Sequence, residues 1–146
     1  MYQITKNIIE IDSLYEKVAD PSHGAISTFA GTVRAQTGDR LTTHLEYEAY
    51  PAMAEKKMAE IGEEAKGKWP IGQVAIVHRI GRLNIGEISV LVAVGAGHRK
   101  EAMDACLYLI DRLKEIVPIW KKEYSPDGEF WVEGPKLEEE KLNHDT

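Results

Sequence analysis

The chain has 146 residues, of which 43% are hydrophobic and 29% charged. One globular domain is therefore expected, and whole-chain disorder, a collagen-like repeat and a coiled coil are excluded. Eighteen lysines and arginines stand against 24 aspartates and glutamates, which gives a net charge of −6. A negative field repels a phosphate backbone, so this balance argues against general nucleic-acid binding.

The single cysteine, Cys106, permits no intramolecular disulfide and no thiolate cluster for a structural zinc ion. Such cysteine usage fits the reducing cytoplasm. The first residues, MYQITKNIIEID, lack the basic flank and the apolar run of a signal peptide. The longest apolar stretch, Ile88 to Ala96, is only as long as a strand. We therefore expect a cytoplasmic protein with no membrane association.

In chain order, the first predicted element is a short helix that starts at a capping signal, Asp12 to Glu16, and ends near Ala19. Residues 24–34 (GAISTFAGTVR) are small, β-branched and aromatic, which predicts a strand. The polar segment RAQTGDR, residues 34–40, then predicts a mobile loop.

Residues 41–47 alternate between apolar and polar side chains, with Leu41 on the apolar face, which predicts a strand with one wet face. Pro51 suits the first turn of a helix that ends near Trp69. The apolar residues of this helix fall at the spacing of one buried face: Ala54, Met58, Ile61 and Ala65.

Two strands are predicted next, over residues 73–80 and 87–96, with a glycine-containing turn at 82–86 between them. The second strand is apolar on both faces, so we place it inside a sheet. One of its faces is predicted to carry Ile88, Val90, Val92 and Val94.

A long helix is predicted from about His98 to Val117, followed by a hairpin of strands 119–124 and 129–133 around SPDG. Strands and helices are mixed without strict βαβ alternation, which favours the α+β class.

The chain divides into a single domain over residues 1–135 and an acidic tail over residues 136–146. The tail has too few apolar residues to pack alone, so we expect it to be flexible.

The strongest local feature is GAGHRK, residues 95–100, where an apolar strand meets the long helix. Backbone N–H groups at a helix start, flexible glycines and the basic residues His98 and Arg99 together suit an anion. The spacing is not that of a Walker loop. A tight turn with solvated basic side chains is the alternative, because cations at a helix N-terminus oppose the macrodipole.

The second feature is Lys114, near the end of the long helix. On a helical wheel it lies between the wet face and the buried face, in line with Met103, Leu107 and Ile110. Lost hydration at such a border would make a lysine available as an acid, a base or a nucleophile. The pattern alone favours a side chain that reaches to water. A chain reversal at Pro118 would bring Lys121 back beside Lys114.

Other reactive residue types have simpler interpretations. Cys106 falls in the buried stripe of the long helix, so a packing role is favoured over a nucleophilic one. Four histidines lack metal-ligand spacing, so we expect no metal site and no cofactor: His23, His44, His78 and His144.

Several segments, taken in order, resemble one family, the large (catalytic) subunit of molybdopterin synthase. They lie within residues 24–133, and their combination carries the resemblance more than any single motif does. The segments are FAGTVR (29–34), LEYEAYPAMAEK (45–56), WPIGQVAIVHRIGRLNIGE (69–87), GAGHRKEA (95–102) and LKEIVPIWKKE (113–123), followed by PDG and WVE.

The resemblance implies an α+β fold of the α/β hammerhead type, with a mixed sheet, a long helix in the C-terminal half and a terminal hairpin. It also implies a sulfurtransferase that inserts two sulfurs into cyclic pyranopterin monophosphate to form the dithiolene of molybdopterin. The sulfur would arrive as a thiocarboxylate on the C-terminal Gly-Gly of a small ubiquitin-like partner. Two large and two small subunits would form a heterotetramer.

Matched residue by residue, Lys114 corresponds to the family's principal catalytic lysine and Lys121 to its second. Some relatives carry an arginine after WVE, where this chain has Gly134 and Pro135 and where Lys136 is a candidate replacement. The resemblance implies these substrate-binding residues: Thr32, Val33, Arg34, His98, Arg99, Lys122 and Glu123.

The length of the predicted helix separates two of these residues. Arg99 and Lys114 are fifteen residues apart in the sequence, or about 22 Å along a helix axis. A small pterin does not reach both. We therefore expect a composite pocket at a homodimer interface, with His98 and Arg99 of one subunit facing Arg34, Lys114 and Lys121 of the other.

Two alternatives from other classes remain open. One is a non-catalytic module that presents Trp120 and its basic strand to an acidic peptide. The other is a phosphate-ester hydrolase that uses the GAGHRK turn. Binding of a small protein ending in Gly-Gly fits the synthase or the module, and dithiolene formation separates these two.

Overall fold

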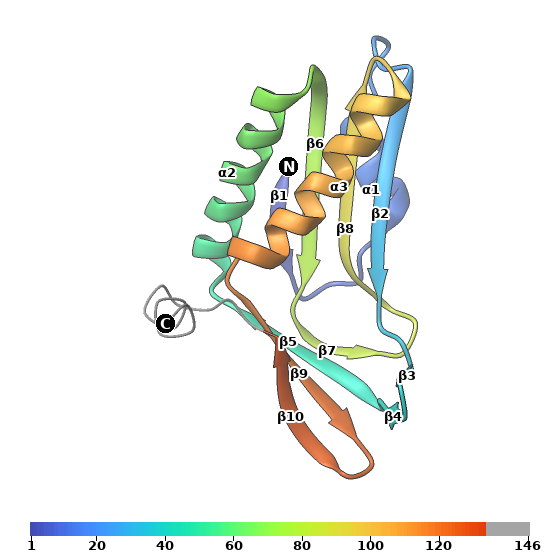
Figure 1. The fold of residues 1–146 in the computed structure, drawn as a ribbon, viewed down its shortest axis with the longest axis vertical. Coiled ribbons are helices and arrows are strands. Elements are labelled where there is room, and N and C mark those ends of the chain that lie inside the picture. Colours follow the sequence, from blue (N-terminus) through green and yellow to red (C-terminus); the bar gives the residue numbers. More distant parts are fainter. Residues whose placement is uncertain (134–146) are drawn as a thin grey trace.

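The computed structural model describes residues 1–133. Three helices and two main sheets make up this part of the chain (Figure 1). In chain order the elements are β1 (Tyr2–Thr5), α1 (Ile11–Val18), β2 (Ala25–Thr32), β3 (Gln36–Thr37), β4 (Arg40–Leu41), β5 (His44–Ala49), α2 (Pro51–Lys68), β6 (Ile71–Arg79), β7 (Gly81–Asn84), β8 (Ile88–Ala96), α3 (Arg99–Ile116), β9 (Ile119–Ser125) and β10 (Gly128–Glu133).

The larger sheet has the strand order β1-β6-β8-β2, in which only β1 and β6 run parallel. Helices α2 and α3 cover one face and α1 covers the other, as Figure 1 shows. Because both faces are covered, the interior strand β8 is buried on both sides, as its sequence predicted. The core between this sheet and the two long helices includes Met58, Ile61, Ile76, Val92 and Leu109.

The smaller sheet has the order β10-β9-β5-β7 and is antiparallel throughout. It lies beyond the end of α3, in the lower part of Figure 1. Its inner face carries Leu45 of β5 and Leu83 of β7, which form a small apolar cluster with Val33, the residue after β2. Helices and strands are mixed without βαβ alternation, so the α+β prediction is confirmed, including the long helix α3 and the terminal hairpin β9–β10.

Four local predictions are wrong, the last of them in part. The N-cap of α1 is Glu10 and makes no side-chain capping bond, so Asp12 lies inside the first turn, where its charge complements the macrodipole. The segment predicted as a loop pairs with itself as β3 and β4, around Gly38 with φ +62°. Leu41 belongs to this ribbon and is 55% exposed. Of the segment predicted as a turn, residues 82–84 instead belong to β7, which pairs with β5, whereas Ile85 and Gly86 do form a turn, with Gly86 at φ +86°.

One residue of β8 faces the side opposite to its prediction. Ile88 packs with the cluster under α1 rather than with Val90, Val92 and Val94. The cause is a shift in the pairing of β2 with β8 at Gly31, which reverses the alternation beyond that point.

The predicted tail, residues 136–146, and its boundary at residue 135 lie outside the described residues. Within residues 1–133, none of the helices combines the length and the apolar character needed to cross a membrane.

Close packing of α1 against β8 generates a stability prediction at Gly95. A Cβ on this residue would lie 2.6 Å from the carbonyl oxygen of Val18 and would overlap the His23 ring. We expect Gly95→Ala to lower the free energy of unfolding by about 1–3 kcal/mol, because overpacking forces the backbone to move. Thermal and urea unfolding measure this.

Gly67→Ala is the matched control, because residue 67 lies on α2 with no described atom within 4 Å of an added Cβ. This change should raise the free energy of unfolding by up to about 1 kcal/mol. Equal stability of the two variants would contradict the packing of α1 on β8.

Candidate active site

A cavity of about 690 Å³ opens where the two sheets and the end of α3 meet. Its described lining comes from β2, β5, β6, β8, α3 and β9, and from the segments next to them. The charged side chains among these lining residues, Arg34, Lys114 and Lys121, are all cationic. A chain with a net charge of −6 thus presents a local site for an anion.

The three cations reach this cavity from different elements. Arg34 follows β2, directly after the buried residue Val33. Lys114 lies in the last turn of α3, where a positive charge complements the helix dipole. The chain then turns at Pro118 and continues as β9, which carries Lys121 and leads away from α3 into the smaller sheet (Figure 1). Lys114 and Lys121 line one cavity, although β9 does not run back along the helix as a chain reversal would.

The remaining wall of the cavity is part apolar and part polar. Thr32, one of the residues predicted to bind substrate, is exposed and lies on the lining. The Ser89 hydroxyl donates to the carbonyl oxygen of Gly31 at 3.2 Å, which ties the polar wall to β2. The apolar side chains of the lining include Phe29, Val90, Ile110, Leu113, Val117 and Ile119.

Sequence reasoning missed His78 and Tyr47 as cavity residues. His78 is 4% exposed, and its Nδ1 lies 2.7 Å from the carbonyl oxygen of Arg79. A carbonyl oxygen can only accept, so Nδ1 is the ring nitrogen that carries the proton and donates it in a hydrogen bond to this oxygen. The Tyr47 ring meets this imidazole edge-on at 4.8 Å. A usable signal was present, since His78 continues the period-two face of Val74 and Ile76.

Lys114 is exposed in the single chain, as is Arg34, so the loss of hydration considered for Lys114 is not seen there. The reason lies on its own helix. Of the three residues in line with Lys114, Met103 and Leu107 are 61% and 62% exposed and only Ile110, at 6%, is buried, so most of this stripe is uncovered in the single chain.

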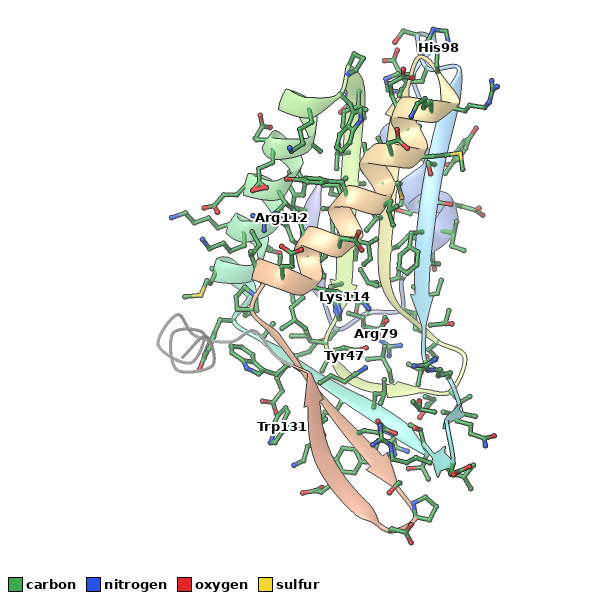
Figure 2. The ribbon with its side chains drawn as sticks, in the orientation of Figure 1. Tyr47, Arg79, His98, Arg112, Lys114 and Trp131 are labelled. Atoms are coloured by element: carbon green, nitrogen blue, oxygen red, sulfur yellow. The ribbon has the colours of Figure 1, made fainter. Side chains whose placement is uncertain are left out.

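Three of the predicted substrate-binding residues, Val33, His98 and Arg99, lie away from the cavity. Val33 is 2% exposed and packs with Leu45 and Leu83. His98 and Arg99 are exposed at the opposite end of α3 from Lys114, as Figure 2 shows for His98. Within one chain they therefore belong to a different surface.

Two more, Lys122 and Glu123, lie on β9 beside Lys121 but do not line the cavity. Successive strand residues face opposite sides, so Lys122 points away from the side of Lys121. Its Nζ lies 3.0 Å from a Glu129 carboxylate oxygen, and this hydrogen bond raises the pKa of Lys122. Glu123 is 4% exposed and accepts hydrogen bonds from Arg40 and Thr42.

The described residues, 1–133, contain no group of three His, Cys, Asp or Glu side chains placed to hold a metal ion. The arrangement that they do contain is a cationic cavity with a buried histidine on its wall. Such a cavity can attract phosphate and carboxylate-like anions and supply groups that move protons.

A family model described as MoaE protein matches residues 4–116. The chain belongs to the MoaE family. Similar proteins named molybdopterin synthase catalytic subunit occur in Halalkalibacterium halodurans, with 49% identity over 95% of this chain and 96% of that protein, and in Bacillus subtilis, with 50% identity over 94% and 87%. The family resemblance found in the sequence is thereby confirmed.

The fold of this MoaE-family chain is also found in solved structures. The crystal structure of molybdopterin synthase from Staphylococcus aureus matches with a TM-score of 0.87 and 48% identity, over 90% of this chain and 96% of that one. A complex of subunits 1 and 2 of molybdopterin-converting factor from Helicobacter pylori matches with a TM-score of 0.77 and 21% identity, over 96% and 97% of the two chains, which supports the fold alone.

The surroundings of Cys106 generate a reactivity prediction for this MoaE-family protein. The side chain is 4% exposed, and burial raises the pKa of its thiol. Less thiolate therefore forms at pH 8 than in an unfolded chain. We expect Ellman's reagent to label the native protein at least about tenfold more slowly than the urea-unfolded protein, because labelling needs a local opening. Equal rates would contradict a packing role for Cys106.

Proposed function

We propose that this chain is the catalytic subunit of a molybdopterin synthase, a sulfurtransferase of molybdenum cofactor biosynthesis. One observation carries the proposal: three cations from segments distant in the sequence, Arg34, Lys114 and Lys121, line a single cavity of a MoaE-family chain. The proposed substrate is cyclic pyranopterin monophosphate, whose phosphate this cationic cavity suits.

The proposed sulfur donor is the thiocarboxylated C-terminus of a small ubiquitin-like partner, a second anion for the same cavity. Sulfur replaces oxygen on the pterin, so protons must reach the leaving oxygen. Lys114 and Lys121 are the proposed proton carriers. Because the partner brings the sulfur, the chain needs no reactive thiol, which agrees with the burial of Cys106. The cytoplasm is the proposed location, since this buried thiol needs no oxidising compartment.

We further infer that two copies of the chain complete the pocket, within a heterotetramer that includes two small subunits. Arg99 and Lys114 lie at opposite ends of α3, and the exposed residues Met103 and Leu107 lie between them. If this apolar stripe packs on its own copy around a two-fold axis perpendicular to the helix, the two α3 helices run antiparallel. Arg99 of each copy then lies opposite Lys114 of the other, and Lys114 loses the exposure that it has in one chain.

The two alternative functions lack this support. A hydrolase at the GAGHRK turn would use His98 and Arg99, which are exposed in one chain and do not line the cavity. A non-catalytic peptide-binding module would not need cations gathered in a cavity, and the similar proteins are named as catalytic subunits.

Substituting Lys114 tests the proposed function. With the thiocarboxylated partner and cyclic pyranopterin monophosphate, we expect Lys114→Ala to lower the rate of dithiolene formation by at least about 100-fold, the usual contribution of a positioned acid or base. The variant should stay folded, with a melting temperature near that of the wild type, because the side chain is exposed in the single chain, and it should still bind the partner.

Lys57→Ala is the matched control, since Lys57 lies on α2 and pairs with Glu60 at the surface. Its activity should equal that of the wild type. A wild-type chain that binds the partner but forms no dithiolene would instead favour the peptide-binding module.

Mixed dimers test the shared pocket. Arg99→Ala and Lys114→Ala proteins should each be inactive alone, whereas a mixture after subunit exchange contains dimers with one intact pocket. If subunits mix at random, half of the dimers are mixed, and activity should recover to roughly a quarter of the wild-type value. Native mass spectrometry verifies the exchange. Confirmed exchange without any recovery would mean that each pocket is built from one chain.

A further inference from the structure

Glu123 is a buried carboxylate with three hydrogen bonds from one neighbouring segment. Arg40 donates through Nε to one carboxylate oxygen at 3.1 Å and through Nη2 to the other at 3.1 Å. The Thr42 hydroxyl donates to Glu123 as well, and this threonine is 7% exposed. A buried charge is tolerated when such charge-assisted bonds satisfy it. We call these three residues the Arg40–Thr42–Glu123 clamp.

The clamp joins two segments that carry cavity cations. Lys121 and Glu123 are two residues apart on β9 and so share a face of the strand. Arg34 begins the segment that contains β3 and β4, and this segment ends at Thr42 and Thr43. The clamp is therefore a side-chain link between the Arg34 segment and the strand of Lys121, beside the bond at 3.1 Å that the Thr43 hydroxyl donates to the carbonyl oxygen of Tyr124.

Backbone bonds fix the ends of the Arg34 segment. The Val33 N–H donates to the carbonyl oxygen of Glu87 at 3.0 Å, and the Thr42 N–H donates to that of Ala35 at 2.8 Å. The Thr43 N–H in turn donates to the carbonyl oxygen of Tyr124 on β9 at 2.8 Å. Between these points the ribbon β3–β4 has only two paired residues on each strand. Such a short ribbon is not stable alone, so its position depends on these backbone bonds at its ends and on the clamp.

We propose that Glu123 is a positioning residue, which acts through Arg40 and Thr42 to hold Arg34 in place relative to Lys121. Glu123 itself does not line the cavity, so it acts without touching the anion. This role replaces the direct substrate contact expected from the sequence. The inference rests on the proposed function only for its kinetic test, because the ordering of the segment can be measured without substrate.

The first experiment measures amide hydrogen exchange of residues 34–43 in the full chain. Arg40→Met removes both guanidinium bonds and leaves the carboxylate buried. We expect exchange at Thr42 and Thr43 to become at least about tenfold faster, since each charge-assisted bond contributes more than a neutral one. Glu123→Gln keeps the shape and a bond to Thr42, so it should give a smaller increase. Arg40→Lys should restore little, because an ammonium group cannot bond both oxygens in the same fork.

Arg112→Met is the matched control. Arg112 also donates through Nε and Nη2 to one carboxylate, that of Glu64, but on the outer side of α2 and α3. Its loss should leave exchange in residues 34–43 unchanged.

The second experiment measures synthase kinetics of the same variants. We expect Arg40→Met to raise the KM for cyclic pyranopterin monophosphate at least about fivefold with a smaller change in kcat, because a misplaced Arg34 weakens anion binding. Arg112→Met should leave both constants unchanged. Unchanged exchange in both Arg40→Met and Glu123→Gln would overturn the proposal. So would faster exchange in Arg40→Met together with wild-type KM and kcat. An inactive wild-type chain would refute the proposed function instead, and the exchange data would still decide whether the clamp orders the segment.

Discussion

The candidate site depends on holding three like charges in one cavity. Arg34, Lys114 and Lys121 repel one another, so their own interaction does not bring them together. What fixes them is the structure around the cavity: the pairing of β2 with β8, the buried face of α3, the pairing of β9 with β5 and the proposed Arg40–Thr42–Glu123 clamp. An anion then meets cations that are already in place, and little ordering free energy is lost when it binds.

The long elements could be predicted from the sequence because each buries a whole face through its own periodicity. Helix α2 and the interior strand β8 are examples. Strand β7 and the β3–β4 ribbon could not be predicted, because two to four residues contain no measurable period and are strands only through the partner that they pair with. Ile88 depends likewise on a register shift that no local pattern encodes.

The residues of the site divide in the same way. The family resemblance supplied residue types, and backbone geometry decided which of them face the cavity. His78 and Tyr47 enter the cavity by strand alternation, which a search for charged motifs does not detect. The burial of Glu123 depends on a segment about eighty residues earlier in the chain, and a linear pattern cannot show such a contact. The exposed stripe on α3 shows that part of the surface next to Lys114 is uncovered in a single chain.

The alternation along β9 also restricts how sequences of this kind can change in length. The chain turns at Pro118 and reaches Lys121 after two residues of strand. An insertion of one residue there would turn each following side chain to the other face of the strand and so exchange the environments of Lys121 and Lys122. An insertion of two residues would return both lysines to their original faces. The hairpin tip, Pro126 and Asp127, is exposed and follows both lysines, so an insertion there leaves the pairing of β9 with β5 and the environments of the two lysines unchanged. Tolerance of insertions should therefore alternate between odd and even lengths beside the helix and lose this alternation at the tip.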